Sequence, residues 1–249
     1  MLFKKSKINI TLALLTILCN GFEIYGQKNS EIPLYNWFDT IIGKGNLGVN
    51  NGTLQTNPYK TIGKNNMYYI ADKYSKGYVR YDSQTYYDVN LKYDIYKDEL
   101  ILNPYGESEH IGLILIKDKI ESFCIKDKRF VKIEKKDNDL PEFTTGYYEK
   151  NEFTPDFIFY IKHHKDIQKG INDNGVFYNF KENHLFFIYL KNKTYQIKSK
   201  NDIIKLFPEQ KKQINAFYST NREILKSDKN QFMKNLMKYI NNFISNTSK

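Results

Sequence analysis

Cysteine is scarce in this chain, and its scarcity excludes a fold held together by disulfide bonds. Among 249 residues only Cys19 and Cys124 occur, and the first lies in an N-terminal segment that we expect to be removed. A single remaining thiol cannot form an intrachain disulfide, so the fold depends on its core. Cys124 lies in IESFCIKD, a strand-like stretch. A buried, unreactive thiol is predicted there, because reactive thiols need an accessible, electropositive site.

Long apolar runs are also missing beyond the N-terminus. No later stretch approaches the ~20 apolar residues of a membrane-spanning helix, so we expect no helical transmembrane span in the mature chain. The N-terminus itself, MLFKKSKINITLALLTILCNGFEIYGQ, begins with lysines and continues with an apolar stretch from Ile8 to Cys19. This order is typical of a secretory signal peptide, and Gly26 can precede a cleavage site. We therefore predict a signal peptide over residues 1–26 and export to the periplasm or the cell exterior.

Two alternatives remain open for this segment. It could stay as an N-terminal anchor, or Cys19 could be lipidated, which would associate the protein with the outer membrane. Leu18 disfavours lipidation, because lipoprotein processing usually needs a small residue there. Removing 26 of the 249 residues leaves 223 and lowers the net charge from +10 to +8, since the segment holds three lysines and Glu23. A chain of this size can bury a substantial core as one β domain, or as one β domain with a small appendage.

The excess of positive charge does not by itself indicate a nucleic-acid partner. The chain has 38 basic and 28 acidic residues, and many lysines stand beside an acidic residue, as in YKDEL and KIEKKDND. A nucleic-acid-binding surface concentrates its positive charge on one face. We therefore expect no nucleic-acid partner, and only unspecific attraction to anionic envelope polymers or lipid headgroups.

Alternation of apolar and polar residues from 85 to 97 predicts a half-buried strand. We expect Asp88, Lys92 and Asp94 to be exposed, and the two aspartates are too far apart to share a proton, at ~3.3 Å per residue. GYVRY before this strand is its predicted partner, with a turn at DSQ. The predicted buried face carries Tyr87, Val89, Leu91, Tyr93 and Ile95, and the polar face carries Tyr86, Asp88, Asn90, Lys92, Asp94 and Tyr96.

Strand-like segments continue to residue 198 and then give way to helical periodicity. The fold class predicted is α+β: an antiparallel β-meander over 77–198, as a sandwich or partly open barrel, followed by C-terminal α-helices over 199–249. Ser199 and Asp202 predict a capping box, Pro208 a helix start and Ser227 the cap of the last helix. That helix carries an apolar stripe, which predicts packing on the sheet, with a membrane-surface helix as the alternative. The strand-like segments are IGLILI, KIESFCI, RFVKI, TGYYEKN, DFIFYIKHH, GVFYNFK, HLFFIYL and TYQIK, and the stripe holds Phe232, Met233, Leu236, Met237, Ile240, Phe243 and Ile244.

The region from 27 to 76 is predicted to be loop-rich, with a short helix around Trp37. GKGNLG at 43–48 matches the glycine spacing of dinucleotide-binding loops, but the VNNGTLQTNPY that follows cannot form the helix such a loop needs. We expect a plain loop with positive φ at Gly43, Gly45 and Gly48, and no cofactor.

The four histidines, His110, His163, His164 and His184, stand in no metal-binding motif. His163 and His164 are adjacent, and on a strand they would point to opposite faces. No serine stands in a nucleophile motif. The sequence therefore indicates no catalytic, cofactor-binding or metal-binding residue.

Several longer segments carry a resemblance: NWFDTIIGKGNLGVNNG, GYVRYDSQTYYDVNLKYDIYKDEL, IKDKIESF with RFVKI, and SKNDIIKLFPEQKKQINAF. In these the chain resembles a group of uncharacterised exported proteins of Bacteroidota. The resemblance implies export and a β-rich body, with no assigned activity. Asp82-Ser83 stands where that group has Asp-Gly in the first hairpin turn.

These observations favour a non-enzymatic binding or interaction protein of the cell envelope. It could hold an apolar ligand between sheet and helix, or recognise another envelope protein. A hydrolase whose site the sequence does not show is the alternative. An apolar cavity would favour a carrier of an apolar ligand. The absence of a cavity would favour recognition of another protein through the surface. A cleft that joins histidines and carboxylates with shifted pKa values would favour the enzyme.

Overall fold

The computed structural model describes residues 31–136, 144–173 and 175–247. The predicted signal peptide lies outside these residues. The chain divides into two compact units, Met1–Gly43 and Lys44–Lys249. In the first unit the described element is helix α2 (Glu31–Ile42), which confirms the short helix expected around Trp37.

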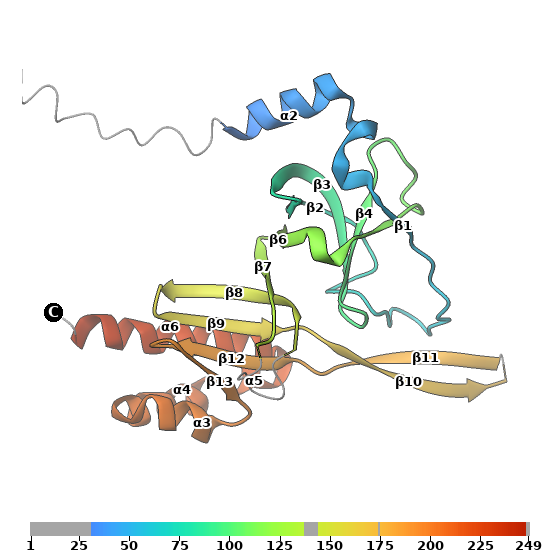
Figure 1. Ribbon diagram of the computed structural model, residues 1–249. Helices are drawn as coiled ribbons and strands as arrows, with labels where there is room; N and C mark the ends of the chain where they lie inside the picture. Colours follow the sequence, from blue (N-terminus) through green and yellow to red (C-terminus); the bar gives the residue numbers. More distant parts are fainter. Residues whose placement is uncertain (1–30, 137–143, 174, 248–249) are drawn as a thin grey trace, which may run out of the picture. The chain divides into compact units, whose positions relative to one another are not determined.

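The second unit is built on an antiparallel sheet of eleven strands (Figure 1). Its order is β1-β5-β4-β3-β2-β6-β7-β8-β9-β12-β13, while β10 and β11 pair separately as a two-stranded ribbon. The strands are β1 (Gly52–Leu54), β2 (Ser75–Tyr81), β3 (Gln84–Asp94), β4 (Glu99–Asn103), β5 (Leu113–Leu115), β6 (Ile120–Ile125), β7 (Lys128–Ile133), β8 (Gly146–Thr154), β9 (Phe157–Lys162), β10 (Lys165–Asn172), β11 (Gly175–Glu182), β12 (Leu185–Leu190) and β13 (Lys193–Ile197).

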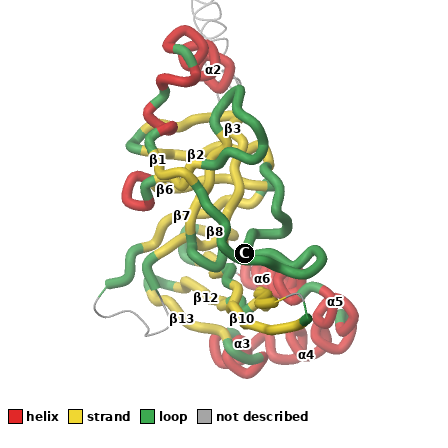
Figure 2. Tube along the Cα trace, turned by 90° about the vertical axis from the view of Figure 1, so that its right-hand side faces the viewer, coloured by secondary structure: helices red, strands yellow, loops and turns green. Residues whose placement is uncertain are grey.

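Four helices follow the sheet and cover part of it. They are α3 (Lys200–Leu206), α4 (Lys211–Thr220), α5 (Arg222–Ser227) and α6 (Lys229–Thr247). Figures 1 and 2 show them gathered beside β9, β12 and β13. This arrangement confirms the α+β class with C-terminal helices after the strands. No helix in the described part of the chain is both long and apolar enough to cross a membrane.

Two large apolar clusters form the core of this unit. One lies among β2 to β8 and is rich in aromatic rings, including Phe123 and Phe130, which stack at 4.8 Å between ring centroids. The other joins Phe159 and Phe186 of the sheet to Leu236 of α6. The predicted packing of the last helix on the sheet is therefore confirmed, since Phe232, Met233, Leu236, Met237 and Ile240 are all buried.

The caps of these helices agree with the sequence in one case and differ in another. Asp202 accepts a hydrogen bond from the backbone N–H of Ser199 at 2.8 Å, as the predicted capping box requires. Ser227, however, ends α5. Asp228 caps α6 instead, since its Oδ1 accepts from the N–H of Gln231 at 2.9 Å.

Strand β3 departs from the predicted alternation at Asp88. This residue has φ 55°, and the register with β2 shifts between Gly77 and Val79. The shift marks a β-bulge, which changes which side chains face the core. Tyr86, predicted on the polar face, is therefore buried together with Leu91, whereas Asp88 is exposed as expected.

The prediction that Lys92 and Asp94 are exposed is wrong. Both are buried, because residues 67–74 cover the second face of β3. Lys92 Nζ pairs with Asp72 Oδ1 at 2.8 Å and lies 4.2 Å from the centre of the Tyr68 ring. Asp94 accepts the N–H groups of the turn that follows, and burial raises its pKa to about 6.

Three hairpins turn through two residues with positive φ and without glycine. The pairs are Asp82-Ser83, Lys126-Asp127 and Lys191-Asn192, with φ between 47° and 66°. This is the turn geometry that matches the twist of the strands, and glycine is the residue that adopts it most easily. Serine at position 83 therefore adopts this turn geometry at a cost in strain.

Replacing Ser83 with Gly is expected to stabilise the protein by about 1 kcal/mol, the usual cost of left-handed backbone in other residues. The backbone N–H of Ser83 donates to Glu121 Oε1, and glycine keeps this bond. Urea unfolding of S83G and of the control S83A measures the effect. An equal gain in S83A would contradict the explanation.

Candidate functional site

The main candidate site is a pocket of about 760 Å³ where the sheet, the β11–β12 turn and the start of α6 meet. We call it the histidine pocket. Its lining residues are Tyr69, Ile70, Ile95, Lys128, His163, Glu182, Asn183, His184, Phe186, Lys226, Ser227, Asp228, Lys229, Asn230, Gln231 and Lys234.

His163 and His164 lie just after β9 and not on a strand as expected, and they differ in burial. The side chain of His163 is 2% exposed and that of His164 is 37% exposed. His163 also contacts the rings of Tyr69, at 4.7 Å between ring centroids, and His184, at 4.9 Å. The fold therefore brings two of the four histidines together at one pocket.

His163 also binds a fully buried carboxylate, that of Glu149. Glu149 on β8 is 1% exposed; its Oε2 lies 2.7 Å from His163 Nε2 and its Oε1 lies 3.2 Å from Lys234 Nζ on α6. Burial opposes the charge of Glu149, but His163 and Lys234 outweigh it and lower the pKa to about 2. The carboxylate is ionised at neutral pH, so Nε2 of His163 carries a proton that it donates.

His184 is neutral and has a defined tautomer. Burial and the positive charges of His163 and Lys165 lower its pKa to about 3. Its Nδ1 accepts a hydrogen bond from the backbone N–H of His164 at 3.2 Å. The proton of the neutral ring must therefore lie on Nε2, which makes that nitrogen a donor.

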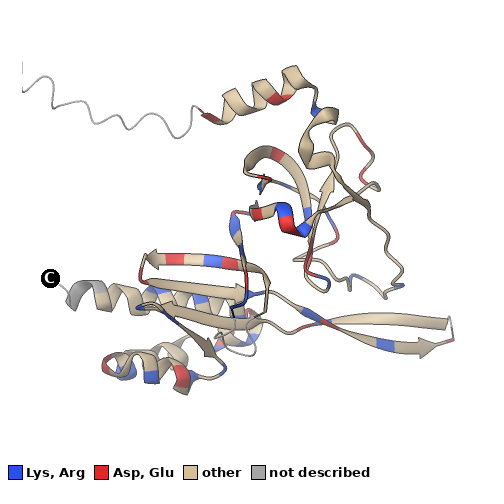
Figure 3. Ribbon diagram, in the orientation of Figure 1, with Lys and Arg blue, Asp and Glu red and all other residues tan. Residues whose placement is uncertain are grey.

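Positive charge dominates the pocket lining. Lys128, Lys226 and Lys229 have no carboxylate within 4.0 Å among the described residues. Asp228 already caps α6 through Oδ1. Elsewhere Figure 3 shows basic and acidic residues interspersed along strands and helices, as the sequence suggested. The local excess of lysine at this pocket is a product of the fold.

One buried polar atom at the pocket lacks a partner. Oδ1 of Asn230, in the first turn of α6, is buried and has no hydrogen-bond partner among the described residues. A buried amide group without a partner costs free energy. Only a ligand group that donates a hydrogen bond can satisfy this acceptor.

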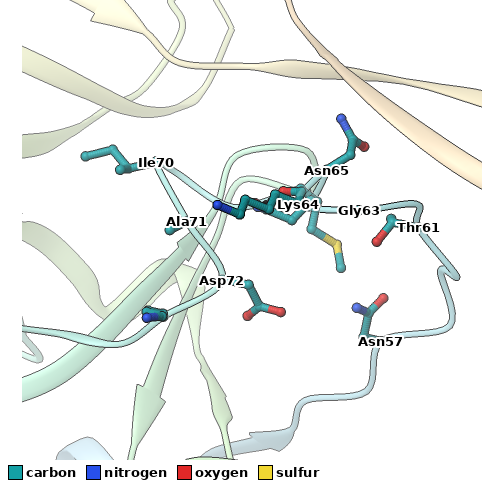
Figure 4. Close-up of a pocket in the computed structure, with 11 residues that line it drawn as sticks. Asn57, Thr61, Gly63, Lys64, Asn65, Ile70, Ala71 and Asp72 are labelled. Carbon is teal, nitrogen blue, oxygen red and sulfur yellow. Dashed lines mark hydrogen bonds between the residues drawn. The ribbon is translucent and has the colours of Figure 1, made fainter.

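A second, smaller pocket of about 460 Å³ lies in the loop between β1 and β2 (Figure 4). Figure 4 shows the side chains of Asn57, Thr61 and Asp72 around the same open space. Ile70 borders both this pocket and the histidine pocket. It has φ 63° in a tight turn in which Ala71 N–H donates to Tyr69 O at 2.7 Å. A branched residue rarely adopts this strained conformation.

The GKGNLG stretch does not form a nucleotide-binding loop. Lys44–Asn46 and Gly48–Asn50 are short 3₁₀ turns, and no strand–loop–helix unit surrounds them in the described chain. Positive φ was expected at all three glycines but occurs at Gly43 alone, with φ 89°.

The remaining sequence predictions concern the thiol and metal ligands. Cys124 is half-buried on β6, and burial raises the pKa of its thiol, which agrees with an unreactive side chain. His110 borders a small pocket with Asp72 and Lys92, apart from the other histidines. In the described ranges no three His, Cys, Asp or Glu side chains are placed to hold a metal ion.

Sequence reasoning missed the grouping of Glu149, His163 and Lys234. The paired histidines in IKHHK were the available signal. Glu149 stands 14 residues before His163, and Lys234 stands 85 residues after Glu149, so the three side chains meet only in the fold. The resemblance to exported proteins of Bacteroidota stays a prediction. The function is argued from this geometry, because comparisons with protein-family models, with curated proteins and with solved structures found no match.

Proposed function

We propose that the protein is an exported binding protein of the cell envelope that holds a small anionic ligand in the histidine pocket. The observation that carries the proposal is the convergence of Lys128, Lys226 and Lys229, unpaired with carboxylates in the described chain, around one pocket. His184 Nε2 already lies 3.4 Å from Glu182 Oε2, so the lysines are the groups that can meet a ligand. Ammonium groups suit a carboxylate or phosphate.

An anionic ligand fits this geometry better than the apolar ligand that the sequence suggested. The apolar side chains between sheet and helices pack against one another, and several are fully buried, such as Phe159, Ile188 and Leu236. The histidine pocket is lined mainly by polar and charged groups instead. Lys226 and Lys229 are exposed at this pocket, so their ammonium groups are accessible to a ligand of opposite charge.

Native mass spectrometry of protein taken from the envelope tests location and ligand together. We expect a chain that begins at Gln27 and retains an acidic molecule. A chain that still carries residues 1–26 would contradict cleavage before Gln27 and favour the retained anchor, without bearing on the ligand.

Thermal unfolding with added anions then tests the pocket. Inorganic phosphate, citrate and glucose 6-phosphate are the probes, and glucose is the neutral control. A ligand at 100 times its Kd stabilises the folded state by about 2.7 kcal/mol. We expect at least one anion to raise the melting temperature, and the double variant K226Q/K229Q to lose the effect. The control K211Q/K212Q removes two exposed lysines of α4. Equal losses in both variants would indicate unspecific attraction.

Hydrolysis is the second candidate, and the His163–Glu149 pair is the observation that favours it. A buried carboxylate orients an imidazole in many general acid–base sites. Ser227 lines the same pocket, although its hydroxyl donates to Glu223 O at 3.0 Å. Activity toward p-nitrophenyl acetate or p-nitrophenyl phosphate that S227A abolishes would support an enzyme. Equal background rates in S227A would argue against this serine as nucleophile.

A further inference from the structure

Two pockets lie side by side along the segment between β1 and β2. One is the pocket of about 460 Å³ shown in Figure 4, and the other has a volume of about 400 Å³. Asn57, Asp72 and Lys73 line both of them. We call the two pockets together the loop groove. Each is within the ~300–1,000 Å³ range of small-molecule sites, so the groove has room for more than one small unit.

A buried charge lines the smaller pocket and is held in place. The side chain of Lys92 is 9% exposed, and its Nζ lies 2.8 Å from Asp72 Oδ1. The same Nζ lies 4.2 Å from the centre of the Tyr68 ring and 4.7 Å from that of Tyr74. Gln55, in the same lining, donates from Nε2 to the Tyr68 hydroxyl at 2.6 Å. Polar groups that are fixed before binding lose little freedom when a ligand arrives.

The charges of this smaller pocket are balanced. Its lining contains two lysines, Lys73 and Lys92, and two carboxylates, Asp72 and Glu109, together with His110. Such a set favours neither an anion nor a cation. An apolar ligand would leave these donors and acceptors without partners, which costs free energy. A hydroxyl group both donates and accepts hydrogen bonds, so it can serve both kinds of group at once.

The larger pocket adds an exposed apolar surface in a strained loop. Ile70 is 65% exposed, and Met67 and Ala71 line the same pocket. The φ of 63° at Ile70 strains the backbone, and strained residues cluster at ligand sites. A sugar ring carries C–H groups on its faces and hydroxyl groups around its edge. It therefore suits a surface that combines apolar side chains with fixed polar groups.

We propose that the loop groove binds a neutral oligosaccharide, with one sugar unit in each of its two pockets. Neighbouring pockets suit linked units, balanced charges suit an uncharged ligand, and Ile70 offers an apolar contact to a ring face. The histidine pocket differs in its excess of lysine, although Ile70 borders it as well. Sugar binding in the loop groove does not depend on anion binding in the histidine pocket.

A glycan array tests the class of ligand. Protein lacking residues 1–26 is applied to neutral glucan, mannan, galactan and xylan oligosaccharides, with oligosaccharides of uronic acids as the acidic comparison. We expect binding to a neutral oligosaccharide. Isothermal titration calorimetry should show that it binds about tenfold or more tightly than its monosaccharide, because two linked units fill two pockets. Binding to acidic oligosaccharides alone, or to no member of the array, would overturn the proposal.

Asn57 supplies the first variant, because it is exposed and lines both pockets. Its Oδ1 accepts the backbone N–H of Tyr59 at 3.0 Å. N57D keeps this acceptor and removes the amide donors, so it should weaken sugar binding about tenfold without changing the melting temperature. K226Q/K229Q, in the histidine pocket, is the control and should bind the sugar as wild type does. Loss of sugar binding in this control, or unchanged affinity in N57D, would overturn the proposal.

Ile70 separates a role in binding from a role in the fold. I70G relieves the positive φ and removes the apolar side chain, so it should raise the melting temperature and weaken sugar binding together. S83G relieves a similar strain in the turn between β2 and β3, and it should raise the melting temperature alone. An I70G protein that melts higher but binds the sugar as tightly as wild type would show that Ile70 makes no contact with the ligand, and the proposed groove would be wrong.

Discussion

Replacing Leu236 with Asp is expected to unfold the second unit of the protein. Leu236 is completely buried between α6 and the sheet, where Phe159, Phe186 and Met233 belong to the same cluster. The substitution removes a core leucine, which alone costs about 2–5 kcal/mol, and adds an unpaired charge in an apolar site. We expect a loss of more than about 4 kcal/mol, which is a large fraction of the stability of a typical domain.

The neighbouring residue supplies the control. Asn235 is exposed on the same helix, and its Oδ1 accepts a hydrogen bond from Gln231 Nε2 at 2.8 Å. N235D adds the same charge and keeps an acceptor there, so it should change the free energy of unfolding by no more than about 0.5 kcal/mol. Urea unfolding and near-UV circular dichroism measure both variants. If the L236D protein stays folded and loses only binding to lipid vesicles, α6 is a membrane-surface helix and its predicted role in the core is wrong.

The sequence allowed prediction of the elements that repeat a simple period. The helical stripe of α6 reports one face of one element, and such a signal needs no knowledge of the remaining chain. For β3 the sequence predicted the strand, but the burial of its residues does not follow the predicted alternation, since Tyr87 and Val89 are only partly buried and Lys92 and Asp94 are buried. β10 was missed because KDIQKGIN has few apolar residues and little alternation. Its partner β11 was predicted, but not the ribbon that the two strands form apart from the main sheet.

The errors have a common physical origin in contacts between distant segments. The alternating pattern places Lys92 and Asp94 on a face predicted to be exposed. Nothing near them in the sequence shows that residues 67–74 pack against these side chains. The bulge at Asp88 likewise depends on the register with β2. The histidine pocket combines residues from six separate regions of the chain, so its excess of lysine could not be seen in a sequence in which basic and acidic residues are interspersed.

The buried carboxylate Glu149 should be the most sensitive charged group of this site. It is the shared partner of His163 and Lys234, and it connects β8 to α6. E149Q keeps the shape of the side chain but leaves those two groups without their negative partner. Removing one member of a buried ion pair typically costs about 3–5 kcal/mol. We expect a loss of that order at pH 7, measured by urea unfolding.

The pH dependence of this loss provides the sharper test. The pKa of Glu149 falls from its ordinary 4.5 to about 2 in the folded protein. Between these values the unfolded chain binds more protons than the folded one, so stability must fall as the pH falls. This lowering of the Glu149 pKa corresponds to roughly 3 kcal/mol of folding stability. This contribution is complete above pH 4.5 and lost near pH 2.

The free-energy difference between wild type and E149Q should therefore shrink as the pH falls from about 4.5 towards 2. Glu121 supplies a matched control, because it pairs with Arg80 at 2.6 Å on the surface, where both side chains are about half exposed. E121Q should cost at most about 1 kcal/mol, as expected for an exposed ion pair. Because the other carboxylates titrate alike in wild type and variant, they cancel in the difference. A difference that stays constant down to pH 2 would show that Glu149 is not held ionised by His163 and Lys234, and the electrostatic account of the histidine pocket would then be wrong.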